Sequence, residues 1–510
     1  MREIIILSLV AFNTFSMAAQ GGFSIFEDLQ TQAYYYDAVY QEPYVVAGGG
    51  ILHPDTFLIG AVYVKYDTLG NQINTGAYYD PDNYNLSFKQ SYPMLLNSEG
   101  KTMMMGDILG KATDVIILWN ENGTVDEVWE YPYQDNAFTN FTYDIIEIDQ
   151  GYLLARSRNI NYEINTVITK LSLTGEVEWE KTYGIPNSAD APGSILQISP
   201  NEFVVGGYRE TTQLSGYNQN YICRQNRLFG IDSTGIMQWQ YFGEPCSTEN
   251  VHGLQQTEDG GYVFSTVEVA LFDPWIIGWQ PKIVRLDADR NLLWELPFTD
   301  TYSPSPQQHY FYNIRKLDNG TYLSGGQLIL PEPYFPSNTP TDTYRAACFF
   351  NFTDSGDSLY RSCVPAPEFS TQGQIGGLVT LPSGSSIAVG TFTENTGNGG
   401  KSWAWVVKVD AQGCLEPDCN VVGTALPPRD EGGVRVFPNP ARGDLQIEFS
   451  QPATGNLELL SAIGQVVRRR ELLSQRQHSL PVADLPRGIY FLRVTDGGGQ
   501  LLHLENVVLR

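Results

Sequence analysis

The sequence predicts an all-β protein in which a seven-bladed β-propeller is followed by a small immunoglobulin-like β-sandwich. Three observations predict this fold. An apolar strand that ends in a glycine turn recurs seven times between residues 60 and 413. A second hairpin motif lies between successive copies of the first, so that each unit holds four short strands. After a Pro/Gly-rich segment, residues 434–510 continue as short runs of alternating apolar and polar residues.

The first motif has the form apolar-Asp-x-x-Gly, and successive copies are 52 to 66 residues apart. A tryptophan follows the turn by four residues in three units, and by six residues at Trp129. Tyr360 takes its place in the sixth unit. The turn positions are Gly70, Gly123, Gly175, Gly235, Arg290, Gly356 and Gly413, and the three tryptophans are Trp179, Trp239 and Trp294. We interpret these aromatic residues as packing between blades rather than as a docking surface for a quinone.

The second motif supplies another strand in every unit, and a further apolar run precedes it. We name the four strands a, b, c and d. Four-stranded sheets that repeat radially form a propeller, and seven units imply seven blades. The second motif begins at Tyr44, Lys101, Gln150, Asn201, Asp259, Asn319 and Ser383. These units resemble the DGGY-type propeller repeats of secreted bacterial proteins, and the eight-bladed quinoprotein fold is the nearest alternative.

The seventh unit lacks its own d strand, because Cys414-Leu-Glu-Pro-Asp-Cys419 follows the last turn. The segment Phe23–Phe26 precedes the first unit, at the place of a d strand. We therefore predict that this segment pairs with strand c of the last blade near residues 406–409 and closes the ring.

Six cysteines predict three disulfides if the chain is exported. Paired residues of an antiparallel hairpin have a constant sum of positions, so a bridge across the hairpin has its midpoint in the turn. This midpoint falls beside Gly235 for Cys223 and Cys246, and beside Gly356 for Cys348 and Cys363. Cys414 and Cys419 are predicted to close the loop that ends the propeller. Reactive or metal-binding thiols are the alternative.

The C-terminal strands contain two glycines at tight places, Gly464 and Gly488, and two prolines that flank Asn439. The segments VRVFPNPARGDLQIEF, LPRGIYFLRV and NVVLR resemble the type A C-terminal sorting domain of the type IX secretion system. An ordinary immunoglobulin-like module is the alternative. The resemblance covers about a sixth of the chain, and its motif residues are Phe437, Pro438, Asn439, Pro440, Gly464, Gly488 and Tyr490. It implies contact with the secretion machinery and later removal of the domain by a sortase-like peptidase.

The N-terminus begins with Arg2, an apolar run over residues 4–12, and Ser16-Met17-Ala18. This pattern predicts a signal peptide over residues 1–18. We expect the propeller over residues 19–424, a linker over 425–433 and the sorting domain over 434–510. Sec-type export to the periplasm would then lead to a secreted or outer-membrane-surface protein, and the sequence predicts no transmembrane segment.

Charge is distributed unevenly along the chain. The formal net charge is −26, and residues 426–510 carry ten Arg, no Lys and nine acidic residues, which leaves −27 on residues 1–425. A strongly acidic body disfavours nucleic acid and anionic membranes as partners. The acidic residues can also simply keep an exported protein soluble.

Long aromatic connections are predicted on one face of the ring. The a–b and c–d turns are tight and lie on one face, whereas several b–c and d–a connections are long, which favours a functional role. The alternative is that their rings pack inward over the blade edges. We predict that a protein or glycan ligand contacts Tyr78, Tyr79, Trp275, Trp279, Tyr334 and Phe335.

The sequence contains no recognisable catalytic constellation. It has no Gly-x-Ser-x-Gly motif, and its five histidines have no metal-ligand spacing. Residues 287–291 imitate the start of a calcium loop without its glycine and distal glutamate, and residues 80–83 form a second acidic run. We assign no catalytic, cofactor or metal residue and expect a secreted binding protein. A polysaccharide-active enzyme or other hydrolase that uses paired carboxylates, and less so a quinoprotein, are the alternatives.

Overall fold

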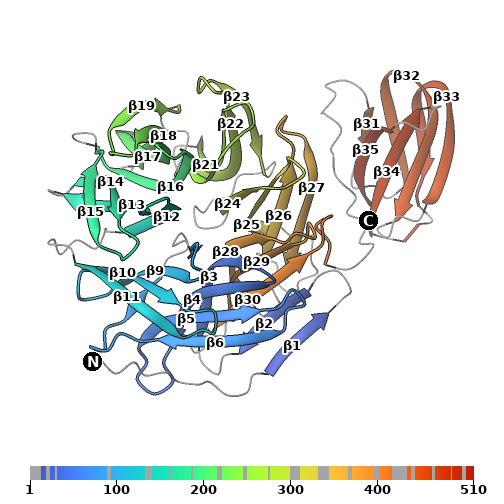
Figure 1. The fold of residues 1–510 in the computed structure, drawn as a ribbon. Coiled ribbons are helices and arrows are strands. Elements are labelled where there is room, and N and C mark those ends of the chain that lie inside the picture. Colours follow the sequence, from blue (N-terminus) through green and yellow to red (C-terminus); the bar gives the residue numbers. More distant parts are fainter. Residues whose placement is uncertain are drawn as a thin grey trace. The chain divides into compact units, whose positions relative to one another are not determined.

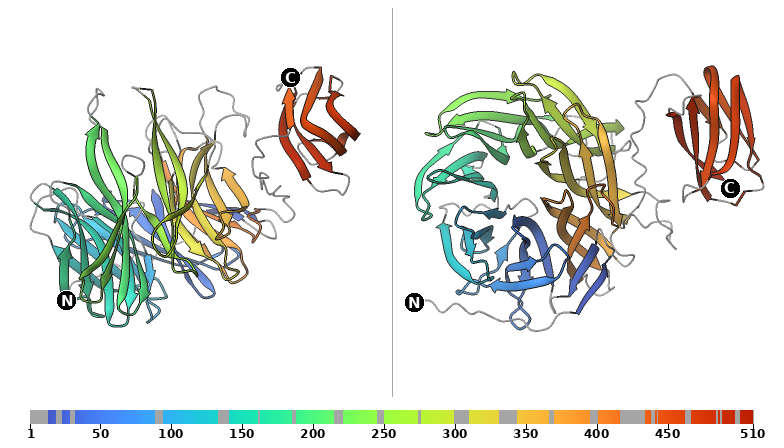
Figure 2. Two further views of the ribbon diagram at one scale, coloured as in Figure 1. Left: turned by 90° about the horizontal axis from the view of Figure 1, so that it is seen from above. Right: turned by 45° about the vertical axis from the view of Figure 1, so that its right-hand side comes forward.

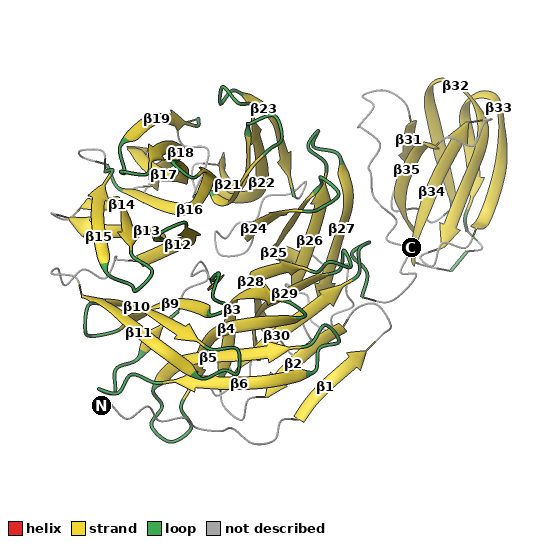
Figure 3. Cartoon of the chain, in the orientation of Figure 1, coloured by secondary structure: helices red, strands yellow, loops and turns green. Residues whose placement is uncertain are grey.

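The chain divides into two compact units, Met1–Val421 and Val422–Arg510, and every element in the described part is a β-strand (Figures 1 and 3). The structure is a computed structural model. It describes residues 13–18, 23–28, 32–88, 94–132, 141–160, 163–184, 188–214, 221–244, 250–273, 276–298, 310–330, 344–365, 370–394, 401–415, 434–437, 441, 443–461, 466–483, 485–486, 488–496 and 501–509.

The described residues of the first unit form seven antiparallel sheets, so the propeller has seven blades and not eight. Blade 1 contains β3 (Ala33–Gln41), β4 (Tyr44–Leu52), β5 (Ile59–Tyr66) and β6 (Gln72–Tyr78). Blade 2 contains β7 (Leu86–Ser87), β8 (Met94–Leu96), β9 (Thr102–Ile108), β10 (Thr113–Trp119) and β11 (Val125–Pro132). Blade 3 contains β12 (Phe141–Ile148), β13 (Gly151–Ile160), β14 (Glu163–Leu171) and β15 (Val177–Thr182). Blade 4 contains β16 (Asp190–Ser199), β17 (Glu202–Leu214), β18 (Tyr221–Asp232) and β19 (Met237–Phe242).

The remaining three blades have the same order of strands. Blade 5 contains β20 (His252–Gln256), β21 (Tyr262–Asp273), β22 (Ile276–Leu286) and β23 (Leu292–Pro297). Blade 6 contains β24 (Tyr310–Lys316), β25 (Tyr322–Leu330), β26 (Tyr344–Phe352) and β27 (Ser358–Pro365). Blade 7 contains β28 (Ser370–Thr380), β29 (Ser386–Glu394), β30 (Lys401–Val409), β2 (Phe23–Asp28) and β1 (Asn13–Ala18).

The innermost strands form a continuous ring. Strand β3 contacts β8, and the contacts continue through β12, β16, β20, β24 and β28 back to β3. Figure 2 shows this ring of blades from two further directions. Strands b and c are buried on both faces between neighbouring blades, whereas strand d alternates between exposed and half-buried residues, as in β15.

The N-terminal segment closes the ring, as the sequence predicts. Strand β2 pairs antiparallel with β30, and the register sets Phe23 opposite Lys408 and Ile25 opposite Val406. Strand β1 pairs with the outer edge of β2 and adds a fifth strand to blade 7. Residues about 380 positions apart in the sequence therefore share one sheet.

The repeated glycine turns have one conformation. The backbone N–H of each turn residue donates to the carbonyl three residues earlier, at 2.8–3.1 Å, and the six glycines have φ between 75° and 88°. Arg290 adopts the same left-handed conformation with φ 69°, so it occupies the glycine position that the sequence assigns to it. Only glycine adopts this region without steric cost.

The predicted disulfide between Cys348 and Cys363 is confirmed. It joins β26 to β27, where the two residues face each other in the register. Cys414 is disulfide-bonded, and its expected partner, Cys419, lies outside the described residues. Cys246 also lies outside them. Cys223 lies in β18, and its bridge to Cys246 stays a prediction.

The second unit is a small β-sandwich. Its strands are β31 (Val434–Phe437), β32 (Asp444–Ser461), β33 (Val466–Pro481), β34 (Gly488–Asp496) and β35 (Leu501–Leu509). Strand β32 pairs with β31 and β33 along its first half and with β33 and β34 along its second half. Leu445, Leu457 and Leu492 belong to its buried core.

Three of the seven predicted motif residues of this unit lie in the described part of the structure. Phe437 ends β31, and Gly488 begins β34. Tyr490 is buried, and its hydroxyl donates to the carbonyl of Pro486 at 2.8 Å. Pro438, Asn439, Pro440 and Gly464 lie outside the described residues.

Candidate functional site

Three connections of blades 1 and 2 meet on the long-loop face, which carries the b–c and d–a connections. They are residues 53–58, residues 79–85 and residues 109–112. Each presents one large apolar side chain to solvent. Phe57 is 72% exposed, Tyr84 is 39% exposed and Leu109 is 51% exposed. We call these three residues the rim cluster.

The first connection holds Phe57 outward. The N–H of Phe57 donates to the carbonyl of His53 at 3.0 Å. The His53 Nδ1 atom accepts hydrogen bonds from the N–H groups of Asp55 and Thr56, at 3.1 and 3.2 Å. Phe57 itself has φ 58°, which is uncommon for any residue other than glycine. The loop is therefore fixed by its own hydrogen bonds around a strained residue.

An ion pair holds the second connection against the third. Lys111 Nζ lies 2.9 Å from Asp80 Oδ2 and 2.9 Å from Asp82 Oδ2. Asp80 is only 2% exposed, and its Oδ1 atom accepts from the N–H of Asp82 at 3.0 Å. Partial burial lowers the pKa of Lys111, but the hydrogen bonds that Lys111 donates to the two carboxylates outweigh that effect and raise the pKa. The ammonium group also lies 5.2 Å from the ring centroid of Tyr84.

Asn85 joins all three connections. Its Oδ1 atom accepts from the N–H of Ile59 at 2.8 Å, and its carbonyl accepts from the N–H of Leu109 at 2.8 Å. The rim cluster thus lies on loops whose backbone is tied together. Preorganised loops lose little conformational entropy when they bind a partner.

Backbone strain is concentrated here. Of the five residues other than glycine with positive φ in the described part of the chain, Phe57, Asn83 and Ala112 belong to these connections. Conformations of this kind cost about 1–3 kcal/mol each and cluster at functional sites. The coincidence of strain with exposed apolar side chains makes this rim the candidate binding surface.

The ligand-contacting residues predicted from the sequence have different outcomes. The prediction is wrong for Tyr78, which is 8% exposed and packs in the core between blades 1 and 2, because it ends strand β6 with its ring turned inward. Tyr79 is half-buried, and its ring meets His53 edge to face at 4.8 Å. The side chain of Trp279 and residues Trp275, Tyr334 and Phe335 lie outside the described part.

In two of the b–c connections predicted to be long, the described residues extend the strands. In blade 5, β21 extends to Asp273 and β22 begins at Ile276, and Glu268 faces Gln280 across this hairpin. Residues 208–214 likewise belong to β17. The residues of the two arms face each other across the hairpin, so their backbone N–H and C=O groups pair with one another.

Neither acidic run forms a metal site in the described part of the chain, where no group of three or more His, Cys, Asp or Glu residues could hold an ion. Asp287 accepts hydrogen bonds from the backbone N–H and side-chain amide of Asn291, at 2.7 and 3.0 Å, and so closes its own turn. Asp80 is occupied by Lys111.

Two carboxylates on the innermost strands are the nearest approach to a catalytic pair. Asp37 accepts from the N–H groups of Ala38 and of Met94 in the next blade, both at 2.8 Å. Asp144 similarly accepts from Ile195 of the next blade at 2.8 Å. Burial raises the pKa of each to about 6, while the nearby charge of Arg315 lowers it. Both carboxylates hold neighbouring blades together, so their hydrogen-bonding capacity is largely used by the fold.

Sequence reasoning missed Phe57, Asn85, Leu109 and Lys111. A single phenylalanine after Asp-Thr, or a lysine after Leu-Gly, has no pattern that distinguishes it from other loop residues. Tyr84 lies within the aromatic connection that the sequence did single out. The acidic run at residues 80–83 was the available signal for the loop anchor, but its partner comes from another blade.

Comparison with known families identifies the second unit. Residues 435–504 match the secretion system C-terminal sorting domain. The C-terminal unit is a secretion sorting domain. A domain of this type implies interaction with the type IX secretion system and export to the cell surface or the extracellular space. In the described part of the chain, no helix is long and apolar enough to cross a membrane.

The propeller unit is similar to several solved structures, and no curated protein matches the chain in sequence. The β-propeller domain of the Trilobed protease from Pyrococcus furiosus is 10% identical, with 73% of this chain and 93% of that chain covered and a TM-score of 0.39. A protein of unknown function from Dyadobacter fermentans is 11% identical, with 77% and 98% covered and a TM-score of 0.39. Prolyl oligopeptidase B from Galerina marginata is 10% identical, with 84% and 57% covered and a TM-score of 0.38. These likenesses concern the fold.

Proposed function

We propose that this protein is an exported, non-catalytic binding protein whose propeller recognises a protein or glycan ligand through the rim cluster. The observation that carries the proposal is the exposure of Phe57, Tyr84 and Leu109 on loops that hydrogen bonds and an ion pair hold in place. Exposed aromatic anchors on rigid supports resemble the hot spots of binding interfaces.

The strained backbone supports the same function. Phe57 keeps an unfavourable φ. It is also the most exposed of the large hydrophobic residues in the described part. Such an arrangement gains nothing for the isolated fold. It is consistent with selection for a partner that covers the ring.

We also propose which segments of the chain are removed during export. Residues 1–18 would be removed as a signal peptide, residues 19–424 would remain as the working propeller, and the linker at 425–433 would let the type A sorting domain be removed. Sequence patterns support these boundaries: the apolar run ends at Ser16-Met17-Ala18, and Pro and Gly residues precede Val434.

A protein and glycan array tests the function. The full chain is compared with a variant that carries Phe57→Ala, Tyr84→Ala and Leu109→Ser. Loss of the bound ligands in this variant supports the proposal. The matched control carries Leu173→Ala and Ile236→Ala, two exposed apolar residues at the c–d turns of the opposite face, and should bind as the wild type does. Unchanged binding by the rim variant, or turnover of a polysaccharide by the wild type, would overturn it.

A further inference from the structure

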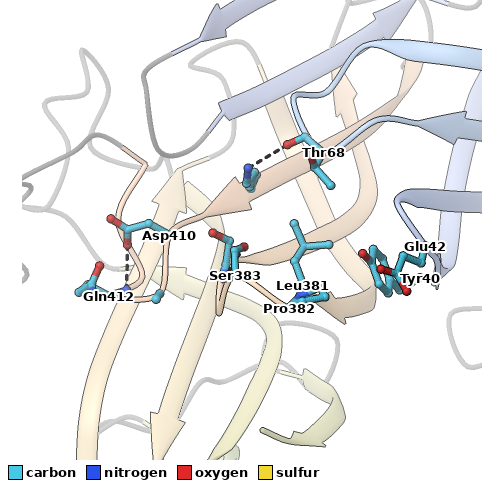
Figure 4. Close-up of a pocket in the computed structure, with 11 residues that line it drawn as sticks. Tyr40, Glu42, Thr68, Leu381, Pro382, Ser383, Asp410 and Gln412 are labelled. Atoms are coloured by element: carbon cyan, nitrogen blue, oxygen red, sulfur yellow. Dashed lines mark hydrogen bonds between the residues drawn. The ribbon is translucent and has the colours of Figure 1, made fainter. Parts of the chain in front are cut away.

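A groove of about 680 Å³ lies between blade 7 and blade 1 on the tight-turn face, opposite to the rim cluster (Figure 4). One wall contains the a–b turn of blade 7, residues 381–385, and its c–d turn, residues 410–412. The other wall contains Tyr40 and Glu42 at the end of β3, and Thr68 in the c–d turn of blade 1. Ligand pockets commonly enclose about 300–1,000 Å³.

The groove is lined by polar side chains that the fold does not use. Within the described residues, the side chains of Tyr40, Glu42, Ser385 and Gln412 make no hydrogen bond to the protein. Ser383 Oγ only accepts a long bond, of 3.4 Å, from the N–H of Ser385. Several hydroxyl, amide and carboxylate groups therefore line the groove with free hydrogen-bonding capacity.

Equivalent turns at other blade boundaries are joined to each other. Gln41 Nε2 donates to the carbonyl of Gly100 at 2.8 Å between blades 1 and 2. The Ser98 hydroxyl donates to Glu147 at 2.6 Å between blades 2 and 3. The boundary of blades 7 and 1 has a contact of this kind at its upper edge, where Lys408 Nζ donates to the carbonyl of Thr68 at 2.8 Å. Lys408 and Thr68 both line the groove beside this contact.

The floor and the charges restrict what can bind. Leu381 is 6% exposed and forms an apolar floor, and the half-buried ring of Tyr40 forms one end. Lys408 on the wall repels a cationic ligand, and the carboxylates of Glu42 and Asp410 repel an anionic one. An uncharged ligand with several hydroxyl groups meets neither penalty. It can also satisfy both donors and acceptors, because a hydroxyl group does both.

We propose that this groove binds a neutral oligosaccharide. The Tyr40 ring packs against the apolar face of a sugar ring, while its hydroxyl group stays wet. Glu42 and the free Oδ2 of Asp410 accept hydrogen bonds from sugar hydroxyl groups, and Gln412 both donates and accepts. The site is separate from the rim cluster, so either can fail without the other.

Calorimetric titration of the full chain with neutral tetrasaccharides of glucose, galactose, mannose and xylose tests the proposal. At least one should bind. Ser383→Trp should weaken that binding by at least about tenfold, because the indole fills the groove. Asp318→Trp, at the preceding position of the matching a–b turn in blade 6, is the control and should bind as the wild type does. Gln412→Ala should weaken binding several-fold, and Asp289→Ala, at the matching c–d turn position in blade 5, should leave it unchanged.

Three outcomes would contradict the proposal. Absence of binding by all four sugars would overturn the proposal. Equal binding by the wild type and both groove variants would place the sugar elsewhere. Binding of arginine-rich peptides, with no binding of neutral sugars, would show that the carboxylates dominate and that the ligand class is wrong. Loss of binding in the rim variant alone would bear on the proposed function and not on this groove.

Discussion

The hydroxyl group of Tyr131 in blade 2 donates a hydrogen bond of 2.7 Å to the carbonyl of Gly175 in blade 3. Trp129 of the same strand packs against the α-carbon of this glycine. The relation recurs around the ring: Tyr183 donates to the carbonyl of Gly235, also at 2.7 Å. Aromatic residues at the d strand of one blade therefore pack against the c–d turn of the next blade. This contact explains why aromatic residues and turn glycines repeat together.

Gly175→Ala should destabilise the propeller by about 2–4 kcal/mol. A Cβ atom at this position would overlap the indole of Trp129, and φ is 80°. Gly320→Ala is the matched control, because φ is also 80° but nothing lies within 4 Å of the added Cβ. It should lose only about 1–2 kcal/mol, the cost of the left-handed backbone. Urea unfolding measures both; equal losses would show that packing against Trp129 has no role.

Arg290→Gly should have little effect on stability, while Arg290→Ala should lower it by about 1 kcal/mol. Arg290 pays for its positive φ, but its guanidinium carbon lies 4.7 Å from the ring centroid of Trp239. Glycine relieves the backbone and loses the ring contact, so the two effects oppose each other. Alanine loses the contact and keeps the strain. Denaturant midpoints of the two variants check the order, and a more stable alanine variant would contradict it.

A chain that begins at residue 32 should be less stable than one that begins at residue 20 by more than about 3 kcal/mol. The shorter chain lacks β2, which covers β30 and pairs Phe23 with Lys408. The longer chain lacks only β1, which extends the outer edge of β2. Thermal melting of both chains measures the difference. Similar melting temperatures would show that the ring does not depend on this strand.

The contribution of the Asp37 side chain to the free energy of unfolding should be lost as the pH rises from about 4 through 6. Burial raises its folded pKa to about 6, above the ordinary value of 3.8, so the folded state binds the proton more tightly than the unfolded state. This contribution is fully present below pH 3.8 and disappears above the folded pKa. The effect amounts to about 1–3 kcal/mol for this side chain.

Unfolding measurements on the wild type and Asp37→Asn between pH 4 and 7 test this dependence. Relative to the wild type, the asparagine variant should have a higher free energy of unfolding at pH 7 than at pH 4, because its side chain cannot lose a proton. The charge of Asp144 raises the pKa of Asp37, so the same comparison is made in an Asp144→Asn background. A difference between the two proteins that does not change with pH would contradict the raised pKa.

Local patterns predicted the propeller correctly because its repeated unit is a local object. Each hairpin needs only a short apolar strand and a residue that tolerates positive φ, and both are visible within a few residues. The pair Cys348 and Cys363 follows from the same locality, since the turn sets the register. Closure by Phe23–Phe26 could also be predicted, because counting strands left one blade incomplete.

The candidate site could not be predicted in the same way. Lys111 finds Asp80 only when blades 1 and 2 stack, and Asn85 reaches Ile59 and Leu109 from a third segment. Blade 1 also lacks an aromatic residue four to six positions after its turn glycine, Gly70, where blades 2 to 6 each carry one. There, Trp119 from the c strand of blade 2 is fully buried and stacks on Tyr63 at 5.6 Å.

The sequence alone determined the number of blades, the turn positions, the strand that closes the ring and the sorting domain at the C-terminus. These features depend on the residue types that a strand or turn requires, or on a motif read in order. The tertiary structure decided that Tyr78 is buried, that β21 and β22 pair through residues 268–273 and 276–281, and that Phe57 and Leu109 reach solvent beside Tyr84. The exposure of a side chain depends on which neighbour covers it, and in a propeller that neighbour belongs to another blade.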